Sequence, residues 1–354
     1  VGLWQERRLA ALLTVLYLAV PLIGVYVASR FRPIFNERYL MVASPAFYLL
    51  IAAALLWIIK SRKVWHTTIP LLLVMALLAT GVLALSNHYF NSQFAKSPPW
   101  RDVVDYIADQ ARPGDALIYT SPLPTIPYYN QDRLPSYLIP YAPDTSLPEA
   151  EQQLQNVLGR HRRVWLVPAE SDRWVSYEVE PWLDRHSARL DQTFFRIIHI
   201  GLYESPGAFY DTMTPQTARF ADGLQLNGFR LAKGEATLIV EGEKAIPLTL
   251  MWSAEHTPGT AYTVFTHLVG PAGALWGQWD NPPVWGTYPT TEWKRGEIVF
   301  DQYLIPLEEN APPGEYHLLV GLYDPASGAR LSVVDDQGGP IGDHILLDAE
   351  LTVQ

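Results

Sequence analysis

Three apolar stretches without a charged side chain constrain the fold of this chain more than any other feature. They cover residues 9–28, 40–59 and 69–86. A helix rises about 1.5 Å per residue, so roughly 20 residues cross the ~30 Å hydrocarbon core of a bilayer. Helices of soluble proteins rarely stay uncharged over such a length. The pattern predicts three transmembrane helices, and the alternative is a very apolar soluble helical bundle.

The short connections between these stretches indicate an orientation. Residues 60–63 carry three Lys or Arg side chains and form the most basic of these connections. The positive-inside rule places such a segment in the cytoplasm. We therefore expect a multi-pass protein of the cell membrane with residues 87–354 on the extracytoplasmic side. The three arginines within residues 29–39 oppose this orientation, unless they bind an anionic ligand at the membrane surface.

Composition excludes several classes of function. The formal charge of −10 argues against a nucleic-acid partner, because phosphates require a basic face. The chain has no cysteine, which excludes disulfides, thiolate metal ligands and cysteine nucleophiles. It begins at Val1, and its first apolar stretch is too long for a signal peptide. We therefore expect the carboxy-terminal part of a longer membrane protein.

After the apolar region, residues 97–205 alternate between helical and strand patterns. Helical spacing of apolar side chains predicts helices over residues 100–111, 147–158 and 174–186. Buried strands are predicted between and after them, over residues 116–120, 163–167 and 194–203. This alternation predicts a small α/β domain with a mainly parallel sheet. No glycine-rich phosphate loop is present, so no nucleotide cofactor is expected.

The remaining residues, 217–354, contain strand patterns separated by turns rich in Pro and Gly. The predicted strands cover residues 224–231, 236–240, 246–254, 262–269, 298–305, 316–323 and 346–353. About seven short strands with such turns are typical of an all-β immunoglobulin-like sandwich. Residues 205–216 form the expected linker before it. The predicted fold is thus a three-helix transmembrane region over residues 1–96, an α/β domain and a β-sandwich.

One cluster of aromatic residues could carry a binding function. Its members lie among Gly and Pro residues between positions 276 and 293: Trp276, Trp279, Trp285, Tyr288 and Trp293. Flat rings can stack on the apolar face of a sugar, so this segment is a candidate contact for glycan. The alternative is that these rings fill one end of the sandwich core. No histidine or carboxylate cluster has metal-ligand spacing, so no metal site is expected.

Two groups of motifs resemble a known enzyme family. Residues 35–45 (FNERYLMVASP) open an apolar stretch, and residues 100–107 (WRDVVDYI), 113–115 and 164–167 follow it. This pattern resembles the dolichyl-phosphate-mannose–protein mannosyltransferase-like family, glycosyltransferase family 39, whose bacterial members are membrane enzymes with the GT-C fold. The resemblance covers residues 1–205, and the sandwich resembles an addition found in some relatives.

The resemblance implies a specific chemistry. Such enzymes transfer a sugar from a polyprenyl-phosphate donor to a protein, lipid or glycan acceptor outside the cytoplasm. Arg38 and Tyr39 would then lie near the donor phosphate, which a guanidinium binds with two parallel hydrogen bonds. The catalytic acidic residue of the family would lie upstream of Val1, so this part alone would be inactive. The alternative is a non-catalytic, membrane-anchored module of the cell envelope that binds glycan or protein through its β-sandwich.

Overall fold

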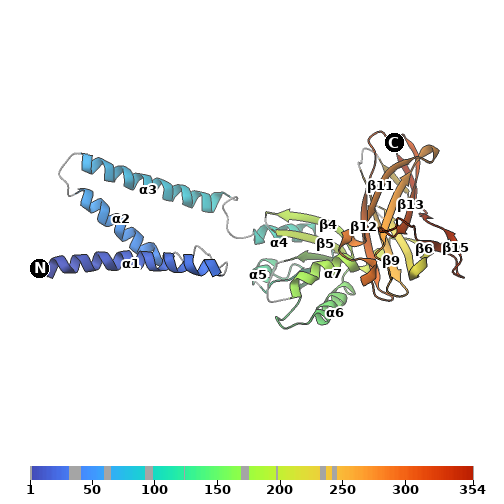
Figure 1. The fold of residues 1–354 in the computed structure, drawn as a ribbon, viewed down its shortest axis with the longest axis horizontal. Coiled ribbons are helices and arrows are strands. Elements are labelled where there is room, and N and C mark those ends of the chain that lie inside the picture. Colours follow the sequence, from blue (N-terminus) through green and yellow to red (C-terminus); the bar gives the residue numbers. More distant parts are fainter. Residues whose placement is uncertain are drawn as a thin grey trace. The chain divides into compact units, whose positions relative to one another are not determined.

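The computed structural model describes residues 2–31, 41–59, 65–91, 99–122, 124–168, 175–196, 198–231, 237–240 and 245–353. The contacts between Cα atoms divide the chain into two compact units, Val1–Lys96 and Ser97–Gln354. The first unit is helical, and the second contains all the strands that the structure describes (Figure 1).

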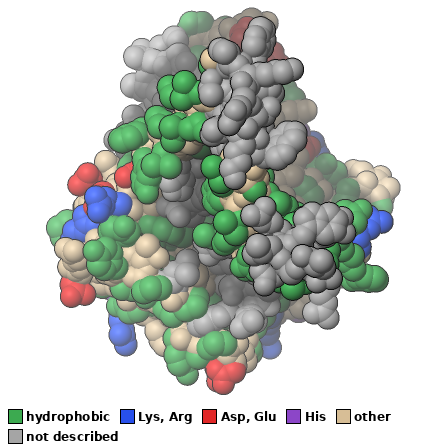
Figure 2. Space-filling view, turned by 90° about the vertical axis from the view of Figure 1, so that its left-hand side faces the viewer, with side chains coloured by type: hydrophobic (Ala, Val, Ile, Leu, Met, Phe, Trp, Pro, Cys, Tyr) green, Lys and Arg blue, Asp and Glu red, His purple; other side chains and the backbone are tan. Residues whose placement is uncertain are grey.

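The first unit is built from the helices α1 (Gly2–Phe31), α2 (Ser44–Ile59) and α3 (Trp65–Phe90). Helix α2 packs against both of the others. Many of the hydrophobic side chains described in this unit are exposed. Figure 2 shows hydrophobic side chains gathered on the surface in a space-filling view. An apolar surface of this extent marks a contact with a membrane or with protein.

The prediction of three transmembrane helices is wrong, and the described residues do not support the multi-pass arrangement. Among the residues described, one helical segment, Leu9–Phe31, is long and apolar enough to cross a membrane, with a mean hydropathy of 2.2. The other apolar helical segments, Met41–Ala54 and Val74–Asn87, have 10–17 residues. Even 17 helical residues extend only about 26 Å, short of the ~30 Å hydrocarbon core. The described part of the chain therefore has one apolar helix with the length of a membrane anchor or signal sequence.

The second unit begins with a five-stranded sheet of order β2-β1-β3-β5-β4. Its strands are β1 (Ala116–Tyr119), β2 (Ser136–Leu138), β3 (Arg163–Val167), β4 (Ala188–Phe195) and β5 (Ile198–Glu204). The helices that accompany it are α4 (Trp100–Gln110), α5 (Thr125–Asn130), α6 (Leu147–Leu158) and α7 (Val179–His186). Helix α6 begins at a capping box, in which the Ser146 N–H donates to Glu149 Oε2 at 2.9 Å.

Alternation along the strands divides the apolar side chains between the two faces of this sheet. Ile118 and Leu166 lie in a buried cluster with residues of α6 and α7, among them Leu154. Leu117 and Trp165 lie in a second cluster, with residues of α4 and α5. The helices therefore cover both faces of the sheet, which makes a three-layer α/β arrangement.

The expectation of a mainly parallel sheet is wrong. Strand β1 pairs in parallel with β2 and β3, but β5 is antiparallel to both β3 and β4. The sequence predicted a single strand over residues 194–203, whereas strand β4 ends at Phe195 and strand β5 begins at Ile198. So short a connection allows only an antiparallel hairpin, because a parallel crossover needs a dozen or more residues.

Two six-stranded sheets form the remainder of the second unit, whereas the sequence predicted about seven strands in all. The first sheet has the order β11-β10-β13-β17-β8, with β16 also paired to β13, and the second has the order β12-β9-β7-β6-β14-β15. Their bounds are β6 (Thr214–Phe220), β7 (Leu224–Leu231), β8 (Thr237–Val240), β9 (Ala245–Ala254), β10 (Thr263–Val269), β11 (Leu275–Asn281), β12 (Ile298–Pro306), β13 (Gly314–Tyr323), β14 (Val333–Val334), β15 (Pro340–Gly342), β16 (Ile345–Leu346) and β17 (Glu350–Val353). This strand-rich part partly fits the predicted sandwich.

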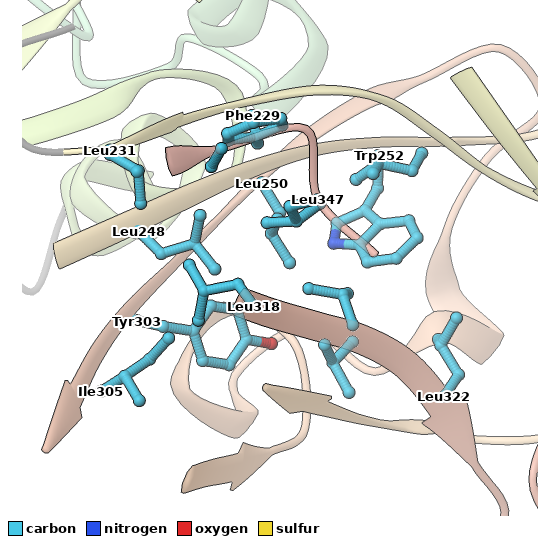
Figure 3. Close-up of a cluster of buried hydrophobic side chains, with 14 of the residues drawn as sticks. Phe229, Leu231, Leu248, Leu250, Trp252, Tyr303, Ile305, Leu318, Leu322 and Leu347 are labelled. Carbon is cyan, nitrogen blue, oxygen red and sulfur yellow. The ribbon is translucent and has the colours of Figure 1, made fainter. Parts of the chain in front are cut away.

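Figure 3 shows the core between these two sheets. Phe229 of β7, Trp252 of β9 and Tyr303 of β12 extend from one sheet towards Leu318 and Leu322 of β13 in the other. These five side chains are all at least nine-tenths buried. Apolar burial contributes about 25 cal/mol per Å², so this layer is the main source of stability for the strand-rich part.

The α/β part and the strand-rich part share a buried contact. Phe209, in the short helix α8 (Pro206–Tyr210), meets Phe300 of β12 edge to face, with ring centroids 5.0 Å apart. Ala188 of β4 and Met251 of β9 belong to the same buried cluster. Helix α7 also packs against β12. The boundary predicted between the two domains, at residues 205–217, stays a prediction, since Ser97–Gln354 form one compact unit.

Candidate functional site

A groove of about 370 Å³ lies where strand β4 of the α/β sheet meets the edge of the strand-rich part. Its lining comes from β4, β11, β12 and the short 3₁₀ turn η7 (Val284–Gly286): Arg189, Leu190, Asp191, Gln192, Trp279, Trp285, Gln302, Tyr303 and Leu304. The groove therefore draws on segments that lie far apart in the sequence.

Strand β11 presents the first indole of the groove. Trp279 is 39% exposed, and its carbonyl accepts a hydrogen bond from Thr266 Oγ1 of the neighbouring strand at 2.8 Å. Gly277 lies two residues earlier, and therefore on the same face of the strand. A Cβ atom at Gly277 would lie 2.2 Å from the carbonyl oxygen of Pro306. The absence of a side chain at Gly277 thus lets β11 approach the end of β12, with Trp279 beside it.

The turn η7 presents the second indole. Val284 and Trp285 both have φ of 53°, and Gly286 has φ of 81°, so three consecutive residues adopt the left-handed region. For residues with a side chain, this region costs about 1–2 kcal/mol each. Val284 is 1% exposed and belongs to the sandwich core, whereas Trp285 remains 37% exposed beside it. Non-glycine residues held in this region often cluster at functional sites.

The buried carboxylate of Asp301 forms a hydrogen bond to the backbone of this turn. Its Oδ1 accepts a hydrogen bond from the backbone N–H of Val284 at 2.9 Å, and its Oδ2 accepts one from the Tyr303 hydroxyl. The residue is only 1% exposed. Burial raises the pKa of Asp301 to about 7, although both hydrogen bonds favour the charged form. The carboxyl group is thus a fixed, buried support for the backbone that carries Trp285.

Arg189 lies over Trp285 on the other wall of the groove. Its guanidinium carbon is 4.1 Å from the centroid of the indole, a cation–π contact. The same guanidinium is 3.4 Å from Asp184 Oδ1. Burial raises the pKa of Asp184, and the charge of Arg189 opposes that shift. These contacts orient Arg189 and leave it facing the groove.

Gln302 of β12 forms two hydrogen bonds to the backbone of β4, on the other wall of the groove. Its Oε1 accepts a hydrogen bond from the N–H of Arg189 at 3.1 Å, and its Nε2 donates to the Arg189 carbonyl at 2.8 Å. A side-chain amide that pairs with both backbone groups of one residue replaces a strand neighbour there. The distance between β4 and β12, and so the width of the groove, depends on this pair of bonds.

The arrangement suits binding better than catalysis. Two partly exposed indoles offer flat apolar surfaces, and Asp191, Gln192 and Arg189 offer an acceptor, an amide and donors. The described lining contains one carboxylate, whereas hydrolysis of a glycosidic bond ordinarily uses a pair. In the part of the chain that the structure describes, no group of three or more His, Asp or Glu residues could hold a metal ion.

The predicted aromatic cluster divides into exposed and buried members. Trp279 and Trp285 line the groove. Tyr288 and Trp293 are 5% and 0% exposed, as the packing alternative required of them. Trp276 packs partly buried against the sandwich core. Arg38 and Tyr39, the predicted contacts of a donor phosphate, lie outside the described residues. The transferase role that the resemblance implied stays a prediction.

Several residues of the groove were missed by sequence reasoning. Arg189, Asp191 and Gln192 belong to β4, which has a mostly exposed and polar pattern and was not predicted as a strand. Asp301 carried a usable signal, because it is the one carboxylate inside a mainly apolar strand pattern, residues 298–305. A charged residue at a buried strand position is rare unless it has a dedicated hydrogen-bond role.

Comparison with known proteins adds weak structural likenesses. No protein-family model matches the chain, and no curated protein does. Among solved structures, the C-terminal domain of Wzt gives a TM-score of 0.27 at 13% identity, covering 40% of this chain and 81% of that one. A Niemann-Pick type C2 protein from the Japanese carpenter ant gives 0.21 at 8% identity, covering 40% and 96%. A beta-glucuronidase from glycoside hydrolase family 2 gives 0.21 at 12% identity, covering 38% and 13%. Scores this low assign neither fold nor function.

Proposed function

We propose that this protein is a membrane-anchored carbohydrate-binding protein of the cell envelope, which holds a glycan in the groove between Trp279 and Trp285. The observation that carries the proposal is the pair of partly exposed indoles in one groove, the second of them held on a left-handed turn. A turn of this kind costs free energy, and the burial of Val284 and its hydrogen bond to Asp301 keep the turn in place while the indole of Trp285 stays partly exposed.

The chemistry of the lining fits a sugar. A pyranose ring has an apolar face of C–H groups, which stacks on an indole, and a rim of hydroxyl groups. Asp191 and Gln192 lie where they could accept and donate hydrogen bonds to such a rim. A groove of about 370 Å³ is at the small end of ligand sites, and suits a short segment of a saccharide chain.

The location of the protein follows from the same proposal. The apolar helical segment Leu9–Phe31 serves as the anchor, and the unit Ser97–Gln354 lies outside the cytoplasm, where envelope glycans are found. Protease added to intact, right-side-out membrane vesicles should degrade the second unit. Protection of that unit in sealed vesicles, with degradation only after lysis, would contradict this location.

The binding proposal is tested on the purified full chain in detergent. A panel of neutral gluco-, galacto- and manno-oligosaccharides is screened by intrinsic fluorescence, and each hit is quantified by isothermal titration calorimetry. Trp285→Ala and Trp279→Ala should each weaken binding by about three- to tenfold, the value of one lost ring contact. Tyr128→Ala is the matched control, because Tyr128 is 67% exposed in α5 and does not line the groove.

Two outcomes would reject the proposal. One is that none of the saccharides binds the unsubstituted chain at millimolar concentration. The other is that a saccharide binds, but both tryptophan variants retain full affinity while remaining folded.

A further inference from the structure

A second and larger cavity, of about 800 Å³, lies between the α/β part and the strand-rich part. Helix α6, helix α7 and the segment 292–298 form its walls. Its lining includes the side chains of Glu151, Gln155, Trp182, Arg185, Tyr288 and Lys294. A cavity of this size is in the range of small-molecule sites.

Arg185 is the unusual residue of this cavity. It is half-buried, and its guanidinium carbon lies 4.8 Å from the centroid of the Tyr288 ring. Its Nε is buried and has no hydrogen-bond partner. Among the described residues, no carboxylate lies within ion-pair distance of its guanidinium. A half-buried cation without a counter-charge is costly, and such a group marks a place where an anion binds.

Other partly buried arginines of the same unit show the contrast. Arg163 contacts Asp115, Arg189 contacts Asp184, and Arg230 contacts Glu204. Each of these cations thus has a carboxylate within the fold. Arg185 differs from all three, although it lines a large cavity.

The cavity lining also carries carboxylates, Glu151, Glu178, Glu292 and Glu297, and the last of these is held by hydrogen bonds within the fold. Glu297 accepts hydrogen bonds from His186 Nε2 at 2.8 Å, from the Tyr288 hydroxyl at 2.9 Å and from the Lys294 N–H at 2.9 Å. These bonds fix Tyr288 beneath Arg185 and leave the guanidinium to an external partner. The exposed ammonium of Lys294 lies on the same wall and adds positive charge.

The part of the lining that α6 contributes carries groups of another kind. Glu151 and Gln155 of α6 line it, and Trp182 of α7 adds an aromatic surface. The Glu151 carboxylate accepts hydrogen bonds from hydroxyl groups, and the Gln155 amide both accepts and donates them, so this wall suits a ligand with hydroxyl groups. We propose that the cavity binds an acidic saccharide, whose carboxylate or phosphate pairs with Arg185 and whose hydroxyl groups contact the α6 wall. This second site is independent of the groove at Trp285.

The test uses the purified full chain carrying both Trp279→Ala and Trp285→Ala, so that the groove contributes nothing. Digalacturonate, glucose 6-phosphate and glucose are titrated by calorimetry, to separate a carboxylate, a phosphate and a neutral sugar. At least one acidic probe should bind, and glucose should bind at least tenfold more weakly. Affinity for that acidic probe should fall as salt is raised, because the contact is electrostatic.

Substitutions then assign the contact to Arg185. Arg185→Gln should lower the affinity for the acidic probe at least tenfold, Arg185→Lys should retain part of it, and Arg160→Gln, at an exposed position outside the lining, should change nothing. Arg185→Gln should also leave the Tm within a few degrees, since Arg185 makes no ion pair with the described residues. The proposal is overturned if neither acid binds, if glucose binds equally well, or if Arg185→Gln, checked as folded, binds like its parent.

Discussion

Asp301 accepts a hydrogen bond from the backbone N–H of Val284 at 2.9 Å, one residue before the exposed indole of Trp285. The donor and acceptor come from a turn and from a strand that otherwise belongs to the buried core. Through this bond the strand-rich core determines where an exposed ring lies. The position of the ring therefore depends on the buried carboxyl group of Asp301 and on the left-handed backbone of Val284 and Trp285.

Stability should depend on the protonation of Asp301. Its pKa is raised from 3.8 to about 7 in the folded protein, so folding favours the protonated form. The contribution of this group is complete below the unfolded value and is lost as pH rises through about 7. Asp301→Asn, which mimics the neutral form, should therefore gain stability relative to the parent between pH 5 and pH 8. Urea unfolding at a series of pH values measures this difference directly.

A constant gap between parent and Asp301→Asn over that pH range would show that Asp301 titrates at its ordinary value. Comparing the two proteins at each pH cancels the other titrating groups, such as His267, whose pKa is lowered by burial.

The left-handed turn should discriminate between substitutions at Trp285. Trp285→Asn and Trp285→Val both remove the indole, and both should weaken saccharide binding to the same extent. Asn tolerates a positive φ, whereas a β-branched residue does not. Trp285→Asn should therefore be more stable than Trp285→Val by about 1–2 kcal/mol. Equal unfolding free energies would mean that the turn is relaxed when the ring is absent.

Glu297 should be a structural residue rather than a binding residue. Removing its carboxylate leaves the Lys294 N–H and His186 Nε2 without their acceptor and the Tyr288 hydroxyl with only the Glu292 carbonyl, so Glu297→Ala should cost about 2–4 kcal/mol. Although burial raises the pKa of Glu297, its hydrogen bonds lower the pKa below 4.5 overall. The stability that the charged Glu297 contributes is thus fully present above its ordinary pKa of 4.5, and it is lost as pH falls through the lower pKa of the folded protein.

Chemical denaturation of Glu297→Ala at pH 7 and pH 4 measures both parts of this expectation. Glu315→Ala, at an exposed position of β13, serves as the control and should change stability little. A loss at pH 4 as large as the loss at pH 7 would contradict the proposed charge dependence.

Gly277 should be intolerant of a side chain. A Cβ atom there would overlap the Pro306 carbonyl, so Gly277→Ala should push β11 away from β12 and cost about 1–3 kcal/mol. Because Trp279 lies on the same face of β11, saccharide binding should weaken as well. Gly207→Ala is a suitable control, since a Cβ atom there meets nothing within 4 Å. Thermal unfolding and calorimetry of the two variants decide the matter, and equal behaviour would refute the overlap.

Local patterns predicted many of the individual elements. Helix α6 covers residues 147–158, strand β3 residues 163–167 and strand β7 residues 224–231, as their apolar spacing indicates. Such spacing depends on the period of a helix or strand, which is a property of neighbouring residues. The same patterns gave the wrong membrane topology, because among the described residues only the segment Leu9–Phe31 is both helical and apolar over enough residues to cross a membrane.

The sequence by itself determined that one amino-terminal helix is apolar enough for a membrane, that helices and strands alternate before a strand-rich region, and that aromatic residues gather near position 285. The tertiary structure alone decided which rings stay exposed, and that Arg189 lies over Trp285 while Asp301 supports its turn. The physical reason is distance along the chain. The order of strands and the meeting of β4 with η7 depend on packing between segments nearly a hundred residues apart, and no local period records such a contact.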